Sequence, residues 1–272
     1  MFNNIKYVYV DLDGTTTNST SRFSQRTLEA FRHLKNKGIR IGIITGRSIH
    51  TMQYEMDELC PELPSITING AAIYSKNKTL IDETPLLFES NKVIDLFNKF
   101  GFSFMLYTKN GLYSNNDNNY FFRKLFDKIN NYPDKYKNFE LESIPSETWL
   151  KKRRAYKLLA WYDSESEKEL LINNLQSINN INFYSSGEGL MDVCHKNVSK
   201  GRALKTIVNA LQIDLNELIV FGDNENDISM FEVAKHSVAM SNANDNVKSY
   251  AKYVTELDCE NDGFADYVFK NF

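Results

Sequence analysis

The chain has 272 residues, of which 42% are hydrophobic and 25% are charged. These values are typical of a globular protein and exclude wholesale disorder. A formal net charge of -3, from 32 basic and 35 acidic residues, excludes a general attraction to nucleic acid or to an anionic membrane. At about 150 residues per domain, the length allows two modest domains.

The N-terminal segment, the lack of long apolar runs and the cysteines together predict a cellular compartment. The first residues lack the charged start and apolar core of a signal peptide, and no apolar run reaches the roughly 18 residues of a membrane-spanning helix. The three cysteines, Cys60, Cys194 and Cys259, are far apart in the sequence. They form none of the close pairs that bind zinc or carry out redox chemistry. We therefore expect a cytoplasmic protein with reduced cysteines and no membrane partner.

Strand and helix signals alternate in the first third of the chain. β-Branched and apolar runs predict strands at 5–10, 39–44 and 65–68. Ser24 is a suitable N-cap for a helix that ends at Gly38, and a second helical stretch follows Thr45-Gly46-Arg47 and ends at about Leu59. This alternation is typical of a parallel sheet covered by helices, so we predict an α/β fold.

The middle of the chain has a different pattern. Asn110-Gly111 lies between apolar runs and predicts a hairpin, because both residues tolerate the positive φ of tight turns. Further strands are expected at 154–162 and 181–184, with a helix at 165–175 between them. Residues 84–187 are therefore predicted to form an α+β domain inserted into the sheet domain.

The alternation of strands and helices resumes after the insertion. We expect the sheet domain to consist of residues 1–83 and 188–272. Strands are predicted in its second part at 190–193, 218–221, 237–240 and 253–255, and helices at 199–211 and 228–234.

Two carboxylates follow the first predicted strand, in the segment Asp11-Leu12-Asp13-Gly14-Thr15. Ligands of open parallel sheets bind beyond the carboxyl ends of the strands. Two acids so close repel each other unless a cation lies between them or one stays protonated, which points to a hard metal such as Mg²⁺. Taken alone, a turn rich in Asp that only ends a strand explains these residues equally well.

Three further segments suit a phosphate and a metal. Thr45-Gly46-Arg47 offers a hydroxyl and backbone N–H groups at a strand-to-helix turn, where an anion is favoured, although a plain helix cap is the commoner explanation. Lys200 begins a predicted helix, where a positive charge is unfavourable without a negative partner; a solvent-exposed lysine is the ordinary alternative. The segment 223–227 places carboxylate or amide side chains at all five of its positions, more than a helix cap requires.

Together these segments resemble the four motifs of the haloacid dehalogenase (HAD) superfamily of phosphotransferases, in the same order along the chain: DxDGT, a strand-terminal Thr or Ser, a Lys, and GDxxND. The insertion follows the second motif, where this superfamily carries its larger, C2-type cap. The segments 66–71 and 261–264 resemble the Cof-type subfamily. The resemblance implies a Rossmann-like parallel-sheet core with an inserted α+β cap that sets substrate specificity.

The resemblance also implies an activity and residue roles. Cof-type proteins are mostly Mg²⁺-dependent phosphatases of small phosphorylated metabolites, sugar phosphates above all. Asp11 would be the nucleophile that forms an aspartyl-phosphate, and Asp13 would be the general acid and base. A Mg²⁺ ion would be held by Asp11, by the backbone carbonyl of Asp13 and by Asp223. The phosphate would be bound by Thr45, Gly46, Lys200 and Asn226, and Lys200 would also be a catalytic residue. Asp227 and Asn69 would support these groups.

Two other functions remain open at this point. A sugar phosphomutase shares the motifs and the cap type, and it differs by passing the phosphoryl group to a second sugar hydroxyl instead of water. A catalytically silent metabolite-binding module would keep the fold without turnover, but binding alone has no use for an acid at Asp13. We expect a small phosphorylated metabolite as the partner of this protein, and neither nucleic acid nor a membrane.

Overall fold

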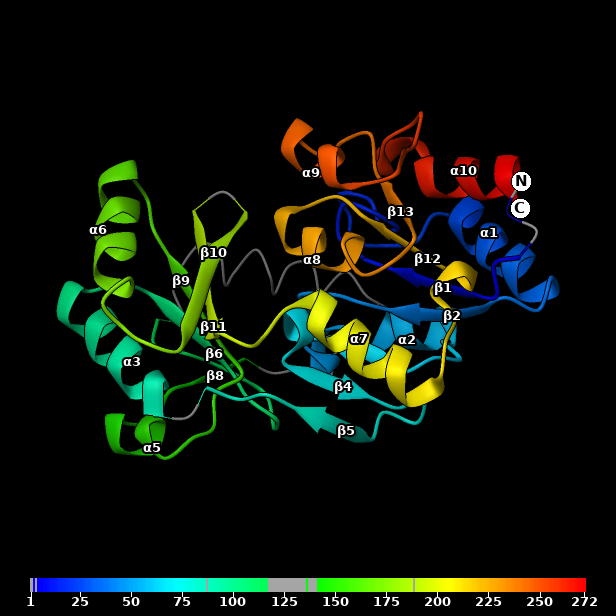
Figure 1. Cartoon of the computed structure of the whole chain (residues 1–272). Helices are drawn as coiled ribbons and strands as arrows, with labels where there is room; N and C mark the ends of the chain where they lie inside the picture. The colour runs from blue at the N-terminus through cyan, green and yellow to red at the C-terminus, as the bar shows by residue number, and fades with distance from the viewer. Residues whose placement is uncertain (1, 3, 87, 117–135, 137–140, 188) are drawn as a thin grey trace. The chain divides into compact units, whose positions relative to one another are not determined.

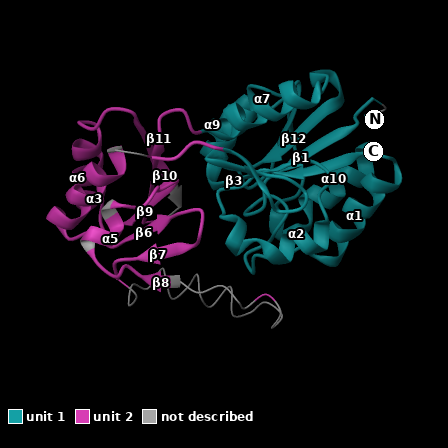
Figure 2. Cartoon of the chain, turned by 90° about the horizontal axis from the view of Figure 1, so that it is seen from below, with its two compact units in different colours: residues 1–82, 199–272 teal, residues 83–198 magenta. Residues whose placement is uncertain are grey.

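The computed structural model describes residues 2, 4–86, 88–116, 136, 141–187 and 189–272. The chain forms two compact units, shown in different colours in Figure 2. The first unit consists of Met1–Asp82 with Ser199–Phe272, and the second consists of Glu83–Val198. Part of the predicted insertion, at 117–135 and 137–140, lies outside the described residues.

The first unit contains a five-stranded parallel sheet, visible in Figure 1. Its strands are β1 (Tyr7–Val10), β2 (Arg40–Ile43), β12 (Leu218–Gly222), β13 (His236–Ala239) and β14 (Tyr253–Val254). The spatial order is β14-β13-β12-β1-β2, and all four pairings are parallel. The predicted α/β class is confirmed, and the order places β1 between the two other strands whose ends carry predicted site residues.

Helices cover both faces of this sheet. One face packs on α1 (Gln25–Asn36), α2 (Gln53–Leu59) and α10 (Gly263–Asn271), and the other on α7 (Lys200–Leu211), α8 (Ile228–Phe231) and α9 (Asp245–Tyr250). Successive strand residues alternate between these cores, as Val8 and Tyr9 do, because neighbouring side chains point to opposite faces. Ser24 caps α1 as predicted, since its Oγ accepts a hydrogen bond from the Thr27 N–H.

The third predicted strand differs from expectation. β3 (Ser65–Thr67) is linked to the parallel sheet by an isolated bridge between Ile44 and Ile66 and is not one of its five strands. It instead pairs antiparallel with β4 (Ala72–Tyr74), in a three-stranded sheet that β5 (Leu80–Glu83) completes. The helix predicted after Thr45 is also interrupted, because η1 (Ile49–Thr51) precedes α2. The other short 3-10 helices of this unit are η2 (Ile68–Gly70), η4 (Leu215–Glu217), η5 (Glu225–Asp227) and η6 (Cys259–Asn261).

The second unit is an α+β domain. Its six-stranded sheet has the order β10-β11-β9-β6-β7-β8 and packs with its helices around one apolar core. The strands are β6 (Phe104–Tyr107), β7 (Leu112–Ser114), β8 (Leu141–Ser143), β9 (Lys157–Trp161), β10 (Ile181–Gly187) and β11 (Leu190–His195). The helices are α3 (Phe88–Phe100), α5 (Glu147–Lys151) and α6 (Glu165–Leu175).

The predicted hairpin is present between β6 and β7, but its turn works differently from the prediction. Neither Asn110 nor Gly111 has a positive φ. The Thr108 hydroxyl instead accepts hydrogen bonds from the N–H groups of both residues, at 3.1 and 3.2 Å. A side chain that competes with the backbone in this way closes the turn without left-handed residues.

One predicted boundary requires correction. The sequence predicts that the strand at 190–193 belongs to the parallel sheet, but β11 pairs antiparallel with both β9 and β10 in the second unit. Its residues Met191 and Val193 contribute to the core of that unit, which continues to Val198 instead of ending at 187. A buried apolar strand looks the same in sequence whichever sheet it joins. In the described parts of either unit, no helix has the length and apolarity to cross a membrane.

Candidate active site

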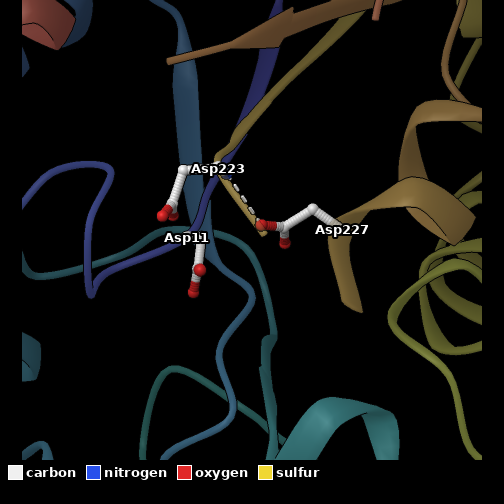
Figure 3. Close-up of side chains that lie close together, drawn as sticks. All are labelled: Asp11, Asp223 and Asp227. Carbon is white, nitrogen blue, oxygen red and sulfur yellow. Dashed lines mark hydrogen bonds between the residues drawn. The ribbon is translucent and has the colours of Figure 1, made fainter. Parts of the chain in front are cut away.

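The predicted motif residues follow the carboxyl ends of three adjacent strands. Asp11 comes directly after β1, Asp223 directly after β12, and Thr45 shortly after β2. Asp11, Asp223 and Asp227 come so close that one carboxylate oxygen of each lies within 4.8 Å of the others (Figure 3). Parallel topology therefore assembles residues that are more than 200 positions apart in the sequence.

Lys200 is the positive charge of this cluster. Its side chain is fully buried, and Nζ lies 3.0 Å from Asp11 Oδ2 and 2.6 Å from Asp227 Oδ1. The residue begins α7, whose N-cap is Ser199, so its ammonium group opposes the helix dipole. The two carboxylates are the negative partners that such a lysine requires.

Asp227 is fixed by contacts on both of its oxygens. Oδ1 accepts from Lys200, and Oδ2 accepts from the backbone N–H of Asp223 at 2.9 Å, the dashed line in Figure 3, and from that of Asn224 at 3.0 Å. A Cβ at Gly222 would lie 2.5 Å from Asp227 Cγ, so only glycine leaves room for this arrangement. With its oxygens engaged in this way, Asp227 is better suited to positioning Lys200 than to holding a metal.

Asp223 is held by the loop that follows β1. Thr15 Oγ1 donates to Asp223 Oδ1 at 2.8 Å, and the Asn242 side-chain amide donates to the Gly14 carbonyl at 2.9 Å. Gly14 has φ +79°, and a Cβ there would lie 2.3 Å from Asp223 Oδ2. The DGT segment therefore needs its glycine for both backbone conformation and space.

The electrostatic balance of the cluster is negative. Burial raises the pKa of Asp11 to about 7, because the opposing effect of Lys200 does not fully compensate it. Burial and the neighbouring carboxylates of Asp11 and Asp227 likewise raise the pKa of Asp223 well above its usual range. For Lys200, burial lowers the pKa, but the two acidic partners outweigh burial and raise it. When all three carboxylates are ionised, the single ammonium group leaves part of their negative charge uncompensated.

A divalent cation fits this uncompensated charge. The donor set consists of hard carboxylate oxygens. Asp227 Oδ2 already accepts from two backbone N–H groups, whereas the oxygens of Asp11 and Asp223 are not engaged in this way and stay available to a metal. Asn226 Oδ1 is buried and has no hydrogen-bond partner among the described residues, so it can accept from a water molecule. Oxygen ligands together with retained waters are the coordination that Mg²⁺ prefers.

Thr45, Gly46, Asn69 and Asn226 form the neighbouring part of the site. Asn69 has φ +56°; its N–H donates to the Thr45 carbonyl at 3.0 Å, and its Oδ1 accepts from Asn226 Nδ2 at 3.0 Å. A Cβ at Gly46 would lie 2.9 Å from Asn69 Oδ1. The Thr45 hydroxyl oxygen, Oγ1, accepts a hydrogen bond from the backbone N–H of Arg47, so the hydroxyl proton is available to an anion.

The Asp13 side chain is half-exposed and is not one of the three clustered carboxylates, but its charge contributes to the raised pKa of Asp11. Both oxygens of Asp13 accept from Arg47, which also pairs with the fully buried Glu55. Arg47, Glu55 and Asn242 are not among the residues that the sequence predicts for the site. Arg47 has a local signal, because it adjoins the Thr-Gly pair, but neither the burial of Glu55 nor the approach of Asn242 has one.

An open parallel sheet with an acidic cluster, a buried lysine and a hydroxyl at adjacent strand ends is the arrangement of an enzyme that acts on phosphate groups. The chain belongs to the family of haloacid dehalogenase-like hydrolases, whose family model matches residues 8–268. The resemblance inferred from the motifs is thus confirmed, and the protein is a phosphatase of this family.

Three known proteins illustrate the similarity. The 5-amino-6-(5-phospho-D-ribitylamino)uracil phosphatase YwtE of Bacillus subtilis is 30% identical, over 94% of this chain and 95% of the relative. The pyridoxal phosphate phosphatase YbhA of Escherichia coli is 24% identical, over 98% of each chain. The structure of a haloacid dehalogenase-like hydrolase from B. subtilis has a TM-score of 0.85 at 24% identity and covers 98% of this chain and 100% of its own.

Proposed function

We propose that the protein is a Mg²⁺-dependent phosphatase that hydrolyses phosphomonoesters of small metabolites, sugar phosphates first among them, through an aspartyl-phosphate on Asp11. The observation that carries this proposal is the buried Asp11 carboxylate at the carboxyl end of β1, where its Oδ2 lies 3.0 Å from Lys200 Nζ and the group is close to Asp223. Asp11 and Asp223, with the backbone carbonyl of Asp13, would hold the metal. When bound, the metal neutralises charge on the phosphoryl group.

Asp11 and Lys200 act in the first step. An Asp11 oxygen forms a bond to phosphorus while the bond from phosphorus to the leaving oxygen breaks. Lys200 and Thr45 bind the phosphoryl oxygens, with the Gly46 backbone and Asn226 alongside. Asp227 keeps the Lys200 ammonium group in place by its 2.6 Å contact. Positioning and charge neutralisation supply most of the rate in phosphoryl transfer.

Asp13 moves the protons of both steps. It donates a proton to the leaving oxygen as the ester bond breaks, and then takes one from the water that attacks the phosphorylated Asp11. Hydrolysis frees the Asp11 carboxylate and inorganic phosphate. General acid and base catalysis of this kind contributes roughly 10²- to 10⁴-fold to the rate.

The proposal extends to substrate choice and location. The two named relatives act on a ribityl phosphate and on pyridoxal phosphate, both small phosphomonoesters. We assign recognition of the organic part to the unit 83–198, because none of the motif residues lies in it. A cytoplasmic location agrees with three free cysteines in the described part of the chain.

A phosphate-release screen tests the proposed function. Sugar phosphates, polyol phosphates, nucleotides and phosphorylated cofactors are incubated with the protein, with and without Mg²⁺. We expect release of inorganic phosphate from several small phosphomonoesters, without a bisphosphate activator, only when Mg²⁺ is present. A requirement for a sugar bisphosphate, with transfer to a second sugar, would instead identify a phosphomutase, and no turnover of any phosphoester would contradict the proposal.

A further inference from the structure

Arg47 links two carboxylates that the motifs do not connect. Its Nε donates to Asp13 Oδ2 at 2.6 Å, its Nη2 donates to Asp13 Oδ1, and its Nη1 donates to Glu55 Oε1 at 2.7 Å. The guanidinium group thus donates two parallel hydrogen bonds to the Asp13 carboxylate and a third hydrogen bond to Glu55. A planar fork of this kind fixes the orientation of a carboxylate as well as its distance.

The three residues become more buried with distance from Asp13. The side chain of Asp13 is 50% exposed, that of Arg47 is 13% exposed, and that of Glu55 is completely buried. Glu55 lies on α2, which packs into the core of the first unit through Met56 and Leu59. A buried carboxylate is costly unless it is paired, so Glu55 holds Arg47 firmly from the protein interior.

We propose that Arg47 is a positioning residue that orients the Asp13 carboxylate for proton transfer, and that Glu55 holds Arg47 in place. This inference rests on the function proposed above, in which Asp13 serves as general acid and base. An exposed aspartate would otherwise sample several rotamers, and proton transfer requires the carboxylate to stay within hydrogen-bond reach of the reacting oxygen. The contact from α2 through Arg47 supplies this restraint.

The proposed role depends on the leaving group. When the ester bond of an alkyl phosphate breaks, the alkoxide needs the proton of Asp13, whereas p-nitrophenolate is stable as an anion and leaves without one. The ratio kcat/KM includes steps only up to the first irreversible one, the release of the leaving group. A misplaced Asp13 therefore lowers kcat/KM for alkyl phosphates much more than for p-nitrophenyl phosphate.

The experiment compares wild type with Arg47→Met on p-nitrophenyl phosphate and on the best alkyl phosphate of the screen, at saturating Mg²⁺. We expect kcat/KM for the alkyl phosphate to fall by about 10- to 100-fold, against less than about 3-fold for p-nitrophenyl phosphate. For the alkyl phosphate, kcat/KM of Arg47→Lys should lie between the values of wild type and Arg47→Met, because a single ammonium group keeps the charge but not the two parallel hydrogen bonds. An equal fall for both substrates would overturn the proposal and make Arg47 a phosphate-binding or structural residue, and no fall for either would overturn it too.

Two further variants separate the proposed role from a loss of stability and from the general loss of an arginine. Arg47→Met leaves the buried Glu55 without this partner, so the double variant Arg47→Met/Glu55→Gln removes both charges and should recover stability while keeping the leaving-group effect. The matched control is Arg40→Ala, because Arg40 is an exposed arginine at the start of β2. It should leave kcat/KM unchanged for both substrates. Failure of the proposed function itself would be distinct, because wild type would then hydrolyse neither substrate.

Discussion

Lys200 and Asp227 form an ion pair with a distance of 2.6 Å between Nζ and Oδ1, and neither side chain is exposed to solvent. A pair buried this deeply stabilises little against an apolar alternative, but removal of one partner leaves the other charge uncompensated. The pair therefore serves to place the Lys200 ammonium group beside Asp11, and its loss affects both stability and turnover.

The first prediction concerns Asp227→Asn. The amide keeps the shape but loses the charge that faces Lys200, and its single acceptor oxygen cannot serve both Lys200 and the backbone N–H groups of Asp223 and Asn224. We expect the free energy of unfolding to fall by about 3 kcal/mol and turnover to drop at least about 10-fold. Denaturant unfolding and phosphate release measure the two effects. Stability within about 0.5 kcal/mol of wild type would show that the pair does not have this role.

The second prediction is that Asp11→Asn abolishes turnover without unfolding the protein. The amide is isosteric with the carboxylate but is neither a nucleophile nor a charged metal ligand. Phosphate release should fall below detection, and a thermal unfolding curve should remain cooperative. Residual activity above about a tenth of wild type would rule out Asp11 as the nucleophile.

The third prediction uses the pKa of Asp11, which burial raises to about 7. In the unfolded chain the carboxyl group titrates near its ordinary value of about 4. The folded protein therefore holds an extra proton between these values, so this group's contribution to stability is greatest below about pH 4 and is lost as the pH rises to about 7. In EDTA, the Tm of Asp11→Asn minus the Tm of wild type should grow by several degrees from pH 5 to pH 8.

The matched control is the surface residue Asp57, which pairs with Lys78. Asp57→Asn should show no such growth over the same pH range. Saturating Mg²⁺ should reduce the difference for Asp11→Asn, because the bound cation stabilises the ionised carboxylate of wild type. A difference that stays constant from pH 5 to pH 8 would contradict the raised pKa.

The fourth prediction concerns the metal. Chelation should stop turnover, Mg²⁺ should restore it, and Ca²⁺ should inhibit, because the larger ion takes more ligands and displaces the attacking carboxylate of Asp11. Steady-state phosphate release after metal stripping and stepwise addition of each ion measures this. Full activity of the stripped protein in EDTA would refute the metal site.

The fifth prediction tests the corrected boundary of the second unit. Replacement of residues 83–198 by a Gly/Ser linker should leave a soluble core that binds Mg²⁺ but no longer discriminates among phosphoesters. Replacement of 84–187, the boundary predicted from sequence, would leave β11 without both partner strands and expose Met191 and Val193, so this variant should aggregate.

Light scattering and circular dichroism compare the two excisions, and kcat/KM over several phosphoesters measures discrimination. Equal solubility of both excised proteins would contradict the boundary. If the folded core kept the wild-type ranking of substrates, the unit 83–198 would not determine specificity.

The sequence by itself determined the features that repeat locally. The alternation of apolar runs and caps predicted β1, α1, β2, β12 and the α/β class, because these elements follow from local periodicity and from caps such as Ser24. The motif residues Asp11, Thr45, Lys200 and Asp223 could be named as well, since each stands at the end of a strand or the start of a helix. Parallel pairing of β1 with its neighbours then explains why most of them meet.

Tertiary structure decided what depends on partners distant in sequence. β11 reads as an ordinary buried strand, and only its pairing with β9 and β10 places it in the second unit. Glu55 reads as one acid of a helix, and only packing buries it completely and directs it to Arg47. Strand partners and burial arise from contacts across the whole chain, so a local pattern carries no record of them.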